Sequence, residues 1–263
     1  MINLKTKEKY VKHYDMVSDD VKFIAKSLIR LKILITLYES PTDMKELTRI
    51  TDLNYSSVST ALHKLELNGM IYRKSNKYYL VNSIRLQVKN LIELAIIINL
   101  LEEIFNIIQG HVIDKIPKES IVEFHLLKNA ELLESDWGNP NKVLDLIEST
   151  LDEANSARCI LPVYYDGFNE KLNDLQNSDK FVEIKVAKSL LNVYEENSNV
   201  RYLSTFSGRN NFLLIVTNEV MIFGLFNNEN MFDKNRIIIS KSRDSLKWAN
   251  NLFRYFKKIH KMS

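Results

Sequence analysis

The stretch that most constrains the fold is residues 42–81, where the hydrophobic period changes twice. In its first ten residues the apolar side chains have the spacing of one face of a short helix, at Met44, Leu47 and Ile50. Thr42 precedes them as a candidate N-cap. Residues 52–55 then interrupt the period, because Asp52 and Asn54 bond to nearby backbone rather than continue a helix. This order predicts a short helix followed by a turn.

A second helix and a hairpin are predicted after this turn. The helical period returns at Ser56, with an inner face formed by Val58, Ala61, Leu62 and Leu65. Gly69 fits the left-handed residue that commonly ends a helix. Two β-prone runs, residues 70–73 and 77–81, then bracket a polar tip at residues 74–76. Helix, turn, helix and hairpin together predict a winged helix-turn-helix.

The outer face of the second predicted helix is short, polar and free of acids between Ser56 and Leu65. Such a helix fits the major groove of DNA, where hydroxyl and amide side chains reach base edges while Lys and Arg neutralise phosphates. We therefore expect double-stranded DNA as a partner. The expected DNA-binding residues are Lys45, Tyr55, Ser56, Ser57, Ser59, Thr60, His63, Lys64, Arg73, Lys74, Asn76 and Lys77. The alternative is a winged helix used only for protein contact.

The roles expected for these residues differ. Ser56, Ser57, Thr60, His63 and Lys64 are expected at the major groove. The hairpin residues Arg73, Lys74 and Lys77 are expected at phosphates or the neighbouring minor groove, and Lys45 and Tyr55 at the DNA backbone.

Residues 56–71 resemble the winged-helix regulators of the arsenic-repressor type. In that family a Ser/Thr-Val-Ser run opens the recognition helix, as at residues 57–59 here, and a Leu-x-x-Leu-x-x-x-Gly-Leu-Ile pattern closes it before the wing. Met70 takes the place of the usual Leu. Residues 27–34 also resemble the first helix of such regulators.

The distribution of charge separates two parts of the chain. At 263 residues the chain is longer than a lone winged helix, so we expect a second folded unit. Residues 1–90 hold 16 Lys and Arg against 9 Asp and Glu, a net charge of +7, whereas the remainder holds 20 against 24, a net charge of −4. This asymmetry is typical of a DNA-binding head joined to a body that does not touch DNA.

The helices that flank the winged helix have different expected roles. Residues 1–17 show no period, and we expect them to be loosely held. One long helix is predicted from Ser18 to Tyr38, ended by residues 39–41, as a scaffold. Residues 82–110 predict a helix with two apolar seams, and a helix apolar on two sides must bury both. We therefore expect a homodimer, which suits a palindromic operator; the alternative is a helix buried within one chain.

Beyond Gly110 the pattern alternates between strands and helices. Strands are predicted at residues 121–124, 158–164, 181–186, 200–204, 212–217, 220–226 and 236–240. Helices are predicted at residues 142–154, 169–175, 187–195 and 244–260. The expected fold class is therefore α+β: a winged helix-turn-helix at residues 1–83, a linker and dimerisation helix at 84–110, and an α/β sensor or regulatory domain at 111–263.

The end of the chain resembles the archaeal methanogenesis-regulator family, in which a winged helix precedes a second domain. The resemblance rests on Phe-Gly-Leu-Phe at residues 223–226, Phe-Asp at 232–233, and Ser245, Trp248 and the Leu-Phe at 252–253. It implies a transcription regulator. Ala249 and Asn250 follow Trp248 where that family has Gly and Glu.

Several kinds of chemistry find no support in the sequence. The six glycines are too widely spaced for a nucleotide-binding loop, and no His is followed two places later by Lys, the motif of phospholipase D. Cys159 lies in an apolar strand, where a buried filler is the expected role, and the histidines lack zinc-ligand spacing. We expect no enzyme activity, cofactor or metal; the alternative is an enzyme or an enzyme-derived, phosphodiesterase-like α/β domain with an adapted winged helix.

Localisation and an effector site complete the expectations. Charges spread through residues 1–12 and acids within residues 91–108 argue against a signal peptide and a membrane span, so we expect the cytoplasm. Candidates for binding a small-molecule effector are His125, Tyr164, Tyr165 and Arg209, with Trp137 and Trp248 beside them. Large aromatic side chains more often serve burial, which is the alternative for each of them.

Overall fold

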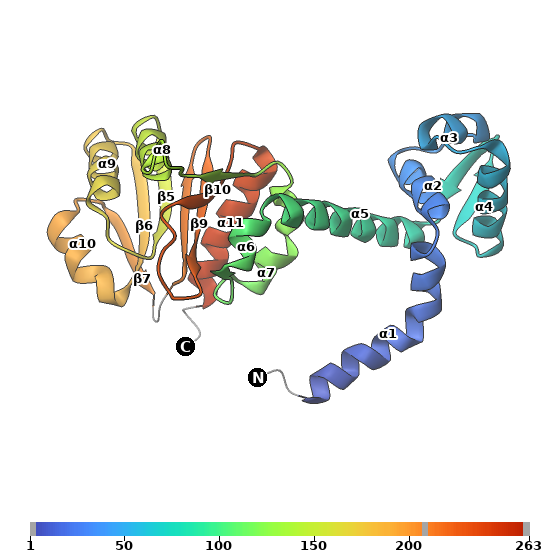
Figure 1. Cartoon of the computed structure of the whole chain (residues 1–263), viewed down its shortest axis with the longest axis horizontal. Coiled ribbons are helices and arrows are strands. Elements are labelled where there is room, and N and C mark those ends of the chain that lie inside the picture. Colours follow the sequence, from blue (N-terminus) through green and yellow to red (C-terminus); the bar gives the residue numbers. More distant parts are fainter. Residues whose placement is uncertain (1–3, 207–209, 260–263) are drawn as a thin grey trace. The chain divides into compact units, whose positions relative to one another are not determined.

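The computed structural model of the chain describes residues 4–206 and 210–259. The chain divides into two compact units, which we call unit 1 (Met1–Leu94) and unit 2 (Ala95–Ser263). Helix α5 (Asn82–Glu103) spans the boundary between them (Figure 1). The predicted α+β class is confirmed, with a winged helix-turn-helix in unit 1 and a sheet domain in unit 2.

Unit 1 is a winged helix preceded by a long helix. Its elements are α1 (Leu4–Ala25), α2 (Leu28–Glu39), α3 (Met44–Thr51), α4 (Tyr55–Leu67), β1 (Ile71–Lys74), β2 (Lys77–Leu80) and the first part of α5. Its core gathers apolar side chains from α2, α3, α4, the hairpin and α5, among them Ile33, Leu37, Leu47, Leu62, Leu65, Ile71 and Val88. These are the inner-face positions of the helical period, so burial of that face fixes how α4 is turned.

Three expectations for unit 1 are wrong. Residues 4–17, where no helical period was found, are helical as part of α1. The long helix predicted from Ser18 is broken at Ser27, because its hydroxyl accepts a hydrogen bond from the backbone N–H of Arg30 at 3.3 Å and so begins α2 as an N-cap. The cap of α3 is Asp43 rather than Thr42, which instead pairs with Tyr78 in an isolated β-bridge.

Unit 2 is built on a mixed sheet. Its strands are β3 (His111–Val112), β4 (Glu131–Glu134), β5 (Ser156–Leu161), β6 (Phe181–Ala187), β7 (Tyr202–Phe206), β8 (Phe212–Thr217), β9 (Met221–Asn227) and β10 (Arg236–Ser240). Its helices are α6 (Phe105–Gln109), α7 (Lys118–Val122), η1 (Phe124–Leu127), α8 (Lys142–Asp152), α9 (Asp166–Asn177), η2 (Lys188–Leu190), α10 (Leu191–Asn197) and α11 (Arg243–Ile259).

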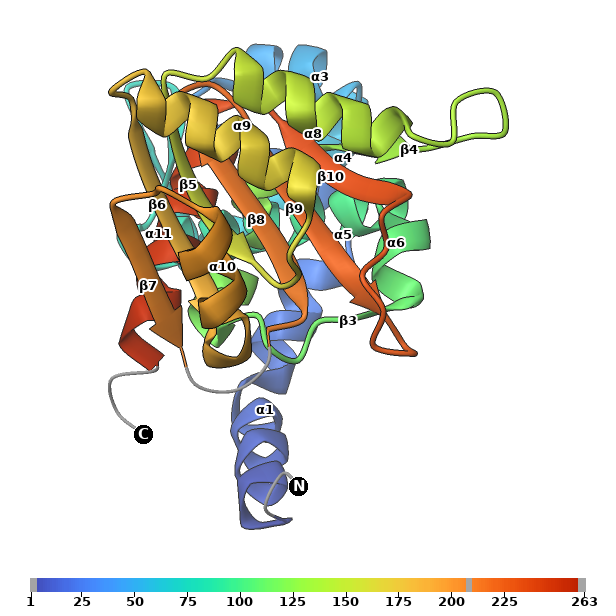
Figure 2. The same ribbon diagram turned by 90° about the vertical axis from the view of Figure 1, so that its left-hand side faces the viewer.

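The strand order is β4-β10-β9-β8-β5-β6-β7, with β3 paired to β9. The pairs β5–β6 and β6–β7 are parallel, since α9 and α10 provide the crossovers, while the other pairs are antiparallel. Helices α8, α9 and α10 cover one face of the sheet, and α11 with α7 covers the other (Figures 1 and 2). Both faces are therefore buried, which explains the continuous apolar runs of β8 and β9.

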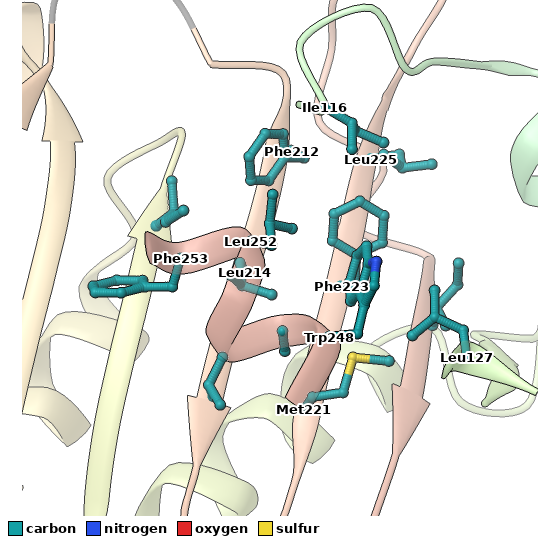
Figure 3. Packing of buried hydrophobic residues seen from close by; sticks show 14 of the residues in the cluster. Ile116, Leu127, Phe212, Leu214, Met221, Phe223, Leu225, Trp248, Leu252 and Phe253 are labelled. Carbon is teal, nitrogen blue, oxygen red and sulfur yellow. The ribbon is translucent and has the colours of Figure 1, made fainter. Parts of the chain in front are cut away.

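The face under α11 holds the largest aromatic side chains. Trp248 is fully buried and meets Phe223 edge to face, with ring centroids 5.2 Å apart (Figure 3). Its indole N–H donates a hydrogen bond to the backbone oxygen of Ser120 at 2.8 Å, which joins α11 to α7. On the opposite face of the sheet, Gly224 lies directly under the Phe232 ring, where an added Cβ would approach within 2.9 Å. The residues at the end of the chain that resemble the methanogenesis-regulator family therefore serve packing.

Some expectations for unit 2 are also wrong. Residues 121–124, predicted as a strand, close α7 and begin η1 instead, because a short apolar run fits either structure. Strands β3 and β4 were not predicted. The helix predicted over residues 82–110 is interrupted at Ile104, between α5 and α6. Within the described residues, no helix is long and apolar enough to cross a membrane, and no cluster of three metal-ligating side chains occurs.

Candidate nucleic-acid interface

Helix α4 presents one apolar and one polar face. Its N-cap is Asn54, whose side-chain oxygen accepts a hydrogen bond from the backbone N–H of Ser57 at 2.8 Å. The buried face consists of Val58, Ala61, Leu62 and Leu65. On the polar face Ser56, Thr60, His63 and Lys64 are exposed, and Ser57 and Ser59 are half-buried. The side chains predicted to read bases therefore lie on the solvent side of the helix.

The turn between α3 and α4 is fixed by caps and by α2. Asp43 accepts a hydrogen bond from the backbone N–H of Glu46 at 2.9 Å, and Asp52 ends α3 in the left-handed conformation at φ 54°. The Lys32 ammonium of α2 donates to the backbone oxygen of Thr51 at 3.0 Å. Lys45 lies in the first turn of α3 and is exposed.

Tyr55, the first residue of α4, keeps 66% of its side chain exposed. It lies at the N-terminal end of α4, one residue before Ser56 of the polar face. A large aromatic side chain that serves the core is normally buried, so this exposure is an observation that burial does not explain.

The wing is a two-residue β-hairpin. Lys74 and Lys77 are the last paired residues of β1 and β2, and the turn residues Ser75 and Asn76 have φ angles of 47° and 67°. Two consecutive positive φ angles are the geometry of a type I′ turn, which matches the twist of the strands. The Asn76 side chain accepts a hydrogen bond from the Arg73 guanidinium at 2.5 Å. All five of these side chains are exposed.

Aromatic side chains and the bridge to residue 42 hold the wing against unit 1. The Tyr72 and Tyr79 rings stack with centroids 5.3 Å apart, and the Arg73 guanidinium lies 5.7 Å from the centroid of Tyr78. Tyr78 exchanges two backbone hydrogen bonds with Thr42, and its burial raises the pKa of its hydroxyl. These contacts fix the root of the hairpin, and so they hold its positively charged tip in position.

A cleft of about 230 Å³ lies between the start of α2 and the polar face of α4. Ser56, Thr60 and Lys64 line one wall, and Ser27 and Arg30 line the other. The Arg30 guanidinium lies 4.1 Å from the centroid of the Phe23 ring, which holds it beside the cleft. Arg30 is not among the residues predicted from the sequence, although Ser27, the capping serine three residues before it, is a signal for a helix start there.

One acidic side chain of α3 is already paired. Glu46 and Arg49 of α3 form an ion pair, which lowers the pKa of Glu46 and raises the pKa of Arg49. The basic side chains Lys64, Lys74 and Lys77 have no acid within their own segments, residues 56–65 and 71–80. The polar face of α4 and the wing therefore form one cationic, hydroxyl-rich surface.

The structure does not bring the effector candidates together. His125 lies in η1, next to residues of the core under α11, whereas Tyr164 packs on the core of the opposite sheet face. The Tyr164 ring meets Tyr194 edge to face at 5.1 Å, and its hydroxyl accepts a hydrogen bond from Asn169 at 3.3 Å; burial raises its pKa. Tyr165 follows it and packs against Phe168 at 4.6 Å.

The three remaining candidates differ in placement. Trp137 is fully exposed, while Trp248 is fully buried in the core under α11. Arg209 lies outside the described residues. The tyrosines follow β5 at the carboxyl end of a parallel pair, which is where ligands commonly bind in open α/β sheets.

Two family models match the chain. The model of the N-terminal domain of methanogenesis regulatory protein FilR1 matches residues 18–101, and the model of its middle domain matches residues 140–259. The methanogenesis regulatory protein FilR1 of Methanothrix harundinacea (strain 6Ac) is 23% identical over 256 residues, covering 92% of this chain and 57% of that protein. The chain thus spans little more than half the length of this relative.

Solved structures with similar folds include two DNA-binding proteins. TrmBL2, described as an archaeal chromatin protein, is 14% identical to this chain with a TM-score of 0.36. The match covers 88% of this chain and 92% of the TrmBL2 chain. A predicted DNA-binding transcriptional regulator from E. coli is 24% identical to this chain with a TM-score of 0.27. The match covers 35% of this chain and 99% of the E. coli chain. TM-scores this low give no basis for carrying over function.

Proposed function

Since this chain belongs to the family of the methanogenesis regulatory protein FilR1, we propose that it is a sequence-specific DNA-binding transcription regulator that acts as a homodimer. One observation carries the proposal: the acid-free polar face of α4 lies exposed beside a basic wing, with Thr60 and Lys64 directed to solvent. A helix with this face and width fits the major groove.

Each part of the interface has a proposed role. The α4 residues Ser56, Ser57, Ser59, Thr60, His63 and Lys64 read base edges in the major groove. The wing residues Arg73, Lys74, Asn76 and Lys77 contact phosphates or the adjacent minor groove, while Lys45 and Tyr55 contact the DNA backbone. Short hydroxyl side chains suit base contact because they approach closely, and long cationic side chains suit phosphates.

The rest of the chain has a supporting role in this proposal. Residues 1–83 bind DNA, residues 84–110 form a linker that takes part in dimerisation, and residues 111–263 form a regulatory domain, which acts in the cytoplasm without catalysis. A small-molecule effector is proposed to bind near Tyr164 and Tyr165, at the carboxyl end of β5. The opposite charges of the two parts of the chain support this division.

The salt dependence of DNA affinity, which reports the counterions released on binding, gives the simplest test of the proposal. Lys74 is exposed at the wing tip, so Lys74→Ala removes one phosphate contact and should lower the slope of log affinity against log salt concentration by about one. It should weaken binding to all sequences alike. Fluorescence anisotropy with a labelled duplex at several salt concentrations measures the slope.

The matched control is Lys142→Ala, which removes a half-buried lysine of unit 2 that pairs loosely with Asp136. It should leave affinity and slope unchanged. An equal change in both variants, or wild-type protein that fails to bind duplex DNA even at low salt, would contradict the proposed function.

A further inference from the structure

A lysine is buried in the middle of the sheet of unit 2. Lys185 lies in β6, and only 4% of its surface is exposed. Its neighbours Val182, Ile184 and Val186 belong to the core under α8 and α9, so by the alternation of a strand Lys185 points to the face under α11. Burying an ammonium group is costly unless polar groups surround it. The surroundings of Lys185 are therefore of interest.

Helix α11 supplies two contacts to this ammonium group. It donates a hydrogen bond to the backbone oxygen of Phe253 at 2.5 Å, and it lies 3.5 Å from the centroid of the Phe253 ring, which projects from α11 over the sheet (Figure 3). A cation over an aromatic face is attracted by the ring. Both contacts are to uncharged groups, so they fix the position of the ammonium group and leave its positive charge in place.

The neighbouring strand adds a guanidinium group to the same face. Arg158 of β5 is paired in register with Glu183 of β6, and its Nε lies 3.7 Å from a carboxylate oxygen of Glu183. From the other side, the guanidinium donates a hydrogen bond to the side-chain oxygen of Asn250 in α11 at 3.1 Å. Arg158 still keeps 44% of its side chain exposed. It is therefore held by β6 and α11 while part of it stays accessible.

These side chains line a pocket of about 220 Å³ between β5, β6 and α11, which we call the α11 pocket. Its lining residues are Arg158, Glu183, Lys185, Asn250, Phe253 and Arg254. The three from α11 reach it together because positions three and four apart share one face of a helix. Three lining side chains are cationic and one is anionic, which gives a local charge of +2, although residues 91–263 carry −4.

Size and charge determine which ligand fits the α11 pocket. Sites for drug-sized ligands have volumes of about 300–1,000 Å³, so this pocket suits a smaller molecule. Guanidinium groups match the oxygens of phosphate and carboxylate, and an ammonium group adds a point charge. A phosphate monoester carries about −1.5 to −2 at neutral pH, which balances the local charge. A monocarboxylate balances only half of it.

We infer that the α11 pocket binds phosphate, either free or as a small phosphate monoester, between Arg158, Lys185 and Arg254. The inference goes beyond the proposed function, which assigns no ligand to this face of the sheet. It is separate from the effector site proposed near Tyr164, because Tyr164 packs on the core of the opposite face. A phosphate bound here connects β5 and β6 to α11.

Isothermal titration calorimetry of the full chain tests the ligand. Inorganic phosphate, glycerol phosphate and acetate are titrated separately. Saturable one-to-one binding is expected for at least one of the two phosphates, and the tighter of them distinguishes a free phosphate site from an ester site. Acetate should bind much more weakly because it has one charge. No saturable binding of either phosphate at millimolar concentration, or acetate binding equally well, would overturn the inference.

Two variants test the residues. Arg254 is exposed, so Arg254→Ala removes a cation from the rim without opening the core, while Lys185→Met removes the buried charge and keeps a long side chain. Each should weaken binding of the phosphate probe by about ten-fold or more. The matched control is Arg243→Ala, an exposed arginine at the start of α11 outside the pocket, which should bind phosphate as the wild type does.

Far-ultraviolet circular dichroism checks that the variants are folded. Unchanged affinity in Arg254→Ala, or an equal loss in the control, would overturn the inference whatever Lys185→Met does.

A third variant should act in the opposite direction. Glu183→Gln removes the one carboxylate of the α11 pocket and keeps its shape, so phosphate binding should become tighter by about three-fold. Weaker binding would contradict the charge argument. A structural role of these residues alone predicts no gain.

Duplex DNA is the last arm of the experiment. Arg254→Ala should leave affinity for duplex DNA unchanged, because unit 2 carries no part of the proposed interface. An equal loss of phosphate and duplex binding would assign the α11 pocket to DNA and overturn the inference. If the wild type binds phosphate but no duplex, the proposed function fails and this inference stands.

Discussion

At the scale of one side chain, replacement of Thr60 tests whether α4 recognises the base sequence of DNA. Its hydroxyl is exposed in the middle of the polar face of α4, where it can reach a base edge. Thr60→Ala should lower the discrimination between the preferred site and singly substituted sites by about 1–3 kcal/mol at one base pair, and change non-specific binding little. Competition binding with substituted duplexes measures the discrimination.

Thr205→Ala in β7, an exposed threonine of unit 2, is the control and should leave discrimination unchanged. Should Thr60→Ala weaken every duplex equally, its hydroxyl would be a phosphate contact rather than a reader of bases.

Cys159 supplies a prediction about pH. Burial in β5 raises the pKa of its thiol, so the folded protein keeps the thiol neutral while the unfolded chain ionises it above pH about 8.5. The stabilisation is present below that pH and is lost as the pH rises. Between pH 7 and pH 10 the wild-type free energy of unfolding should fall by about 2 kcal/mol more than that of Cys159→Ala.

Urea unfolding followed by fluorescence of the buried Trp248 measures this difference for unit 2. Burial, the largest cause, also raises the pKa of Tyr194 in both proteins, and Cys159 adds to that shift in the wild type alone. Equal pH dependence in the two proteins would mean that the thiol is solvated.

At the scale of elements, α11 is held to the sheet through Trp248. Trp248→Ala removes a fully buried side chain and its hydrogen bond to Ser120, and should cost about 3–5 kcal/mol of unfolding free energy. Trp137→Ala is the matched control, because Trp137 is fully exposed, and should change stability by less than about 0.5 kcal/mol. Urea unfolding followed by circular dichroism compares them; similar losses would contradict the packing described for α11.

The elements that sequence analysis predicted best are those with local signals. The helical periods of α3 and α4, Gly69 at φ 62° and the polar tip of the wing are all set by nearby residues. The elements it missed depend on distant partners. Strand β4 is defined by pairing with β10, about a hundred residues away. Similarly, Arg30 joins the cleft at α4 through the fold alone.

The error at α1 has a different physical cause. Of the described side chains of α1 only Ile24 is buried, so the amphipathic pattern of this helix was weak against the surrounding charges. The break at Ser27 was hidden because the residues on both sides keep a helical period. A capping side chain begins a new helix even where the helical period continues, because its oxygen accepts a hydrogen bond from a backbone N–H.

At the scale of the whole molecule, two units with opposite net charge are joined by α5. The positive unit carries the cationic surface of α4 and the wing, and the negative unit is disfavoured near a duplex. Family membership is independent support, since its two models cover parts of both units. The arrangement is the one that the proposed function requires, in which unit 1 binds DNA and unit 2 regulates that binding.

Selection of DNA from a random pool by the purified protein is the decisive test of DNA recognition by α4 and the wing. We predict enrichment of one inverted-repeat sequence, with half-sites about one helical turn apart, as a two-fold dimer requires. The selected duplex should lose its advantage over random DNA when Thr60 and Lys64 are both replaced by alanine. A pool that gains no common sequence, or a selected site that the double variant binds equally well, would contradict the account.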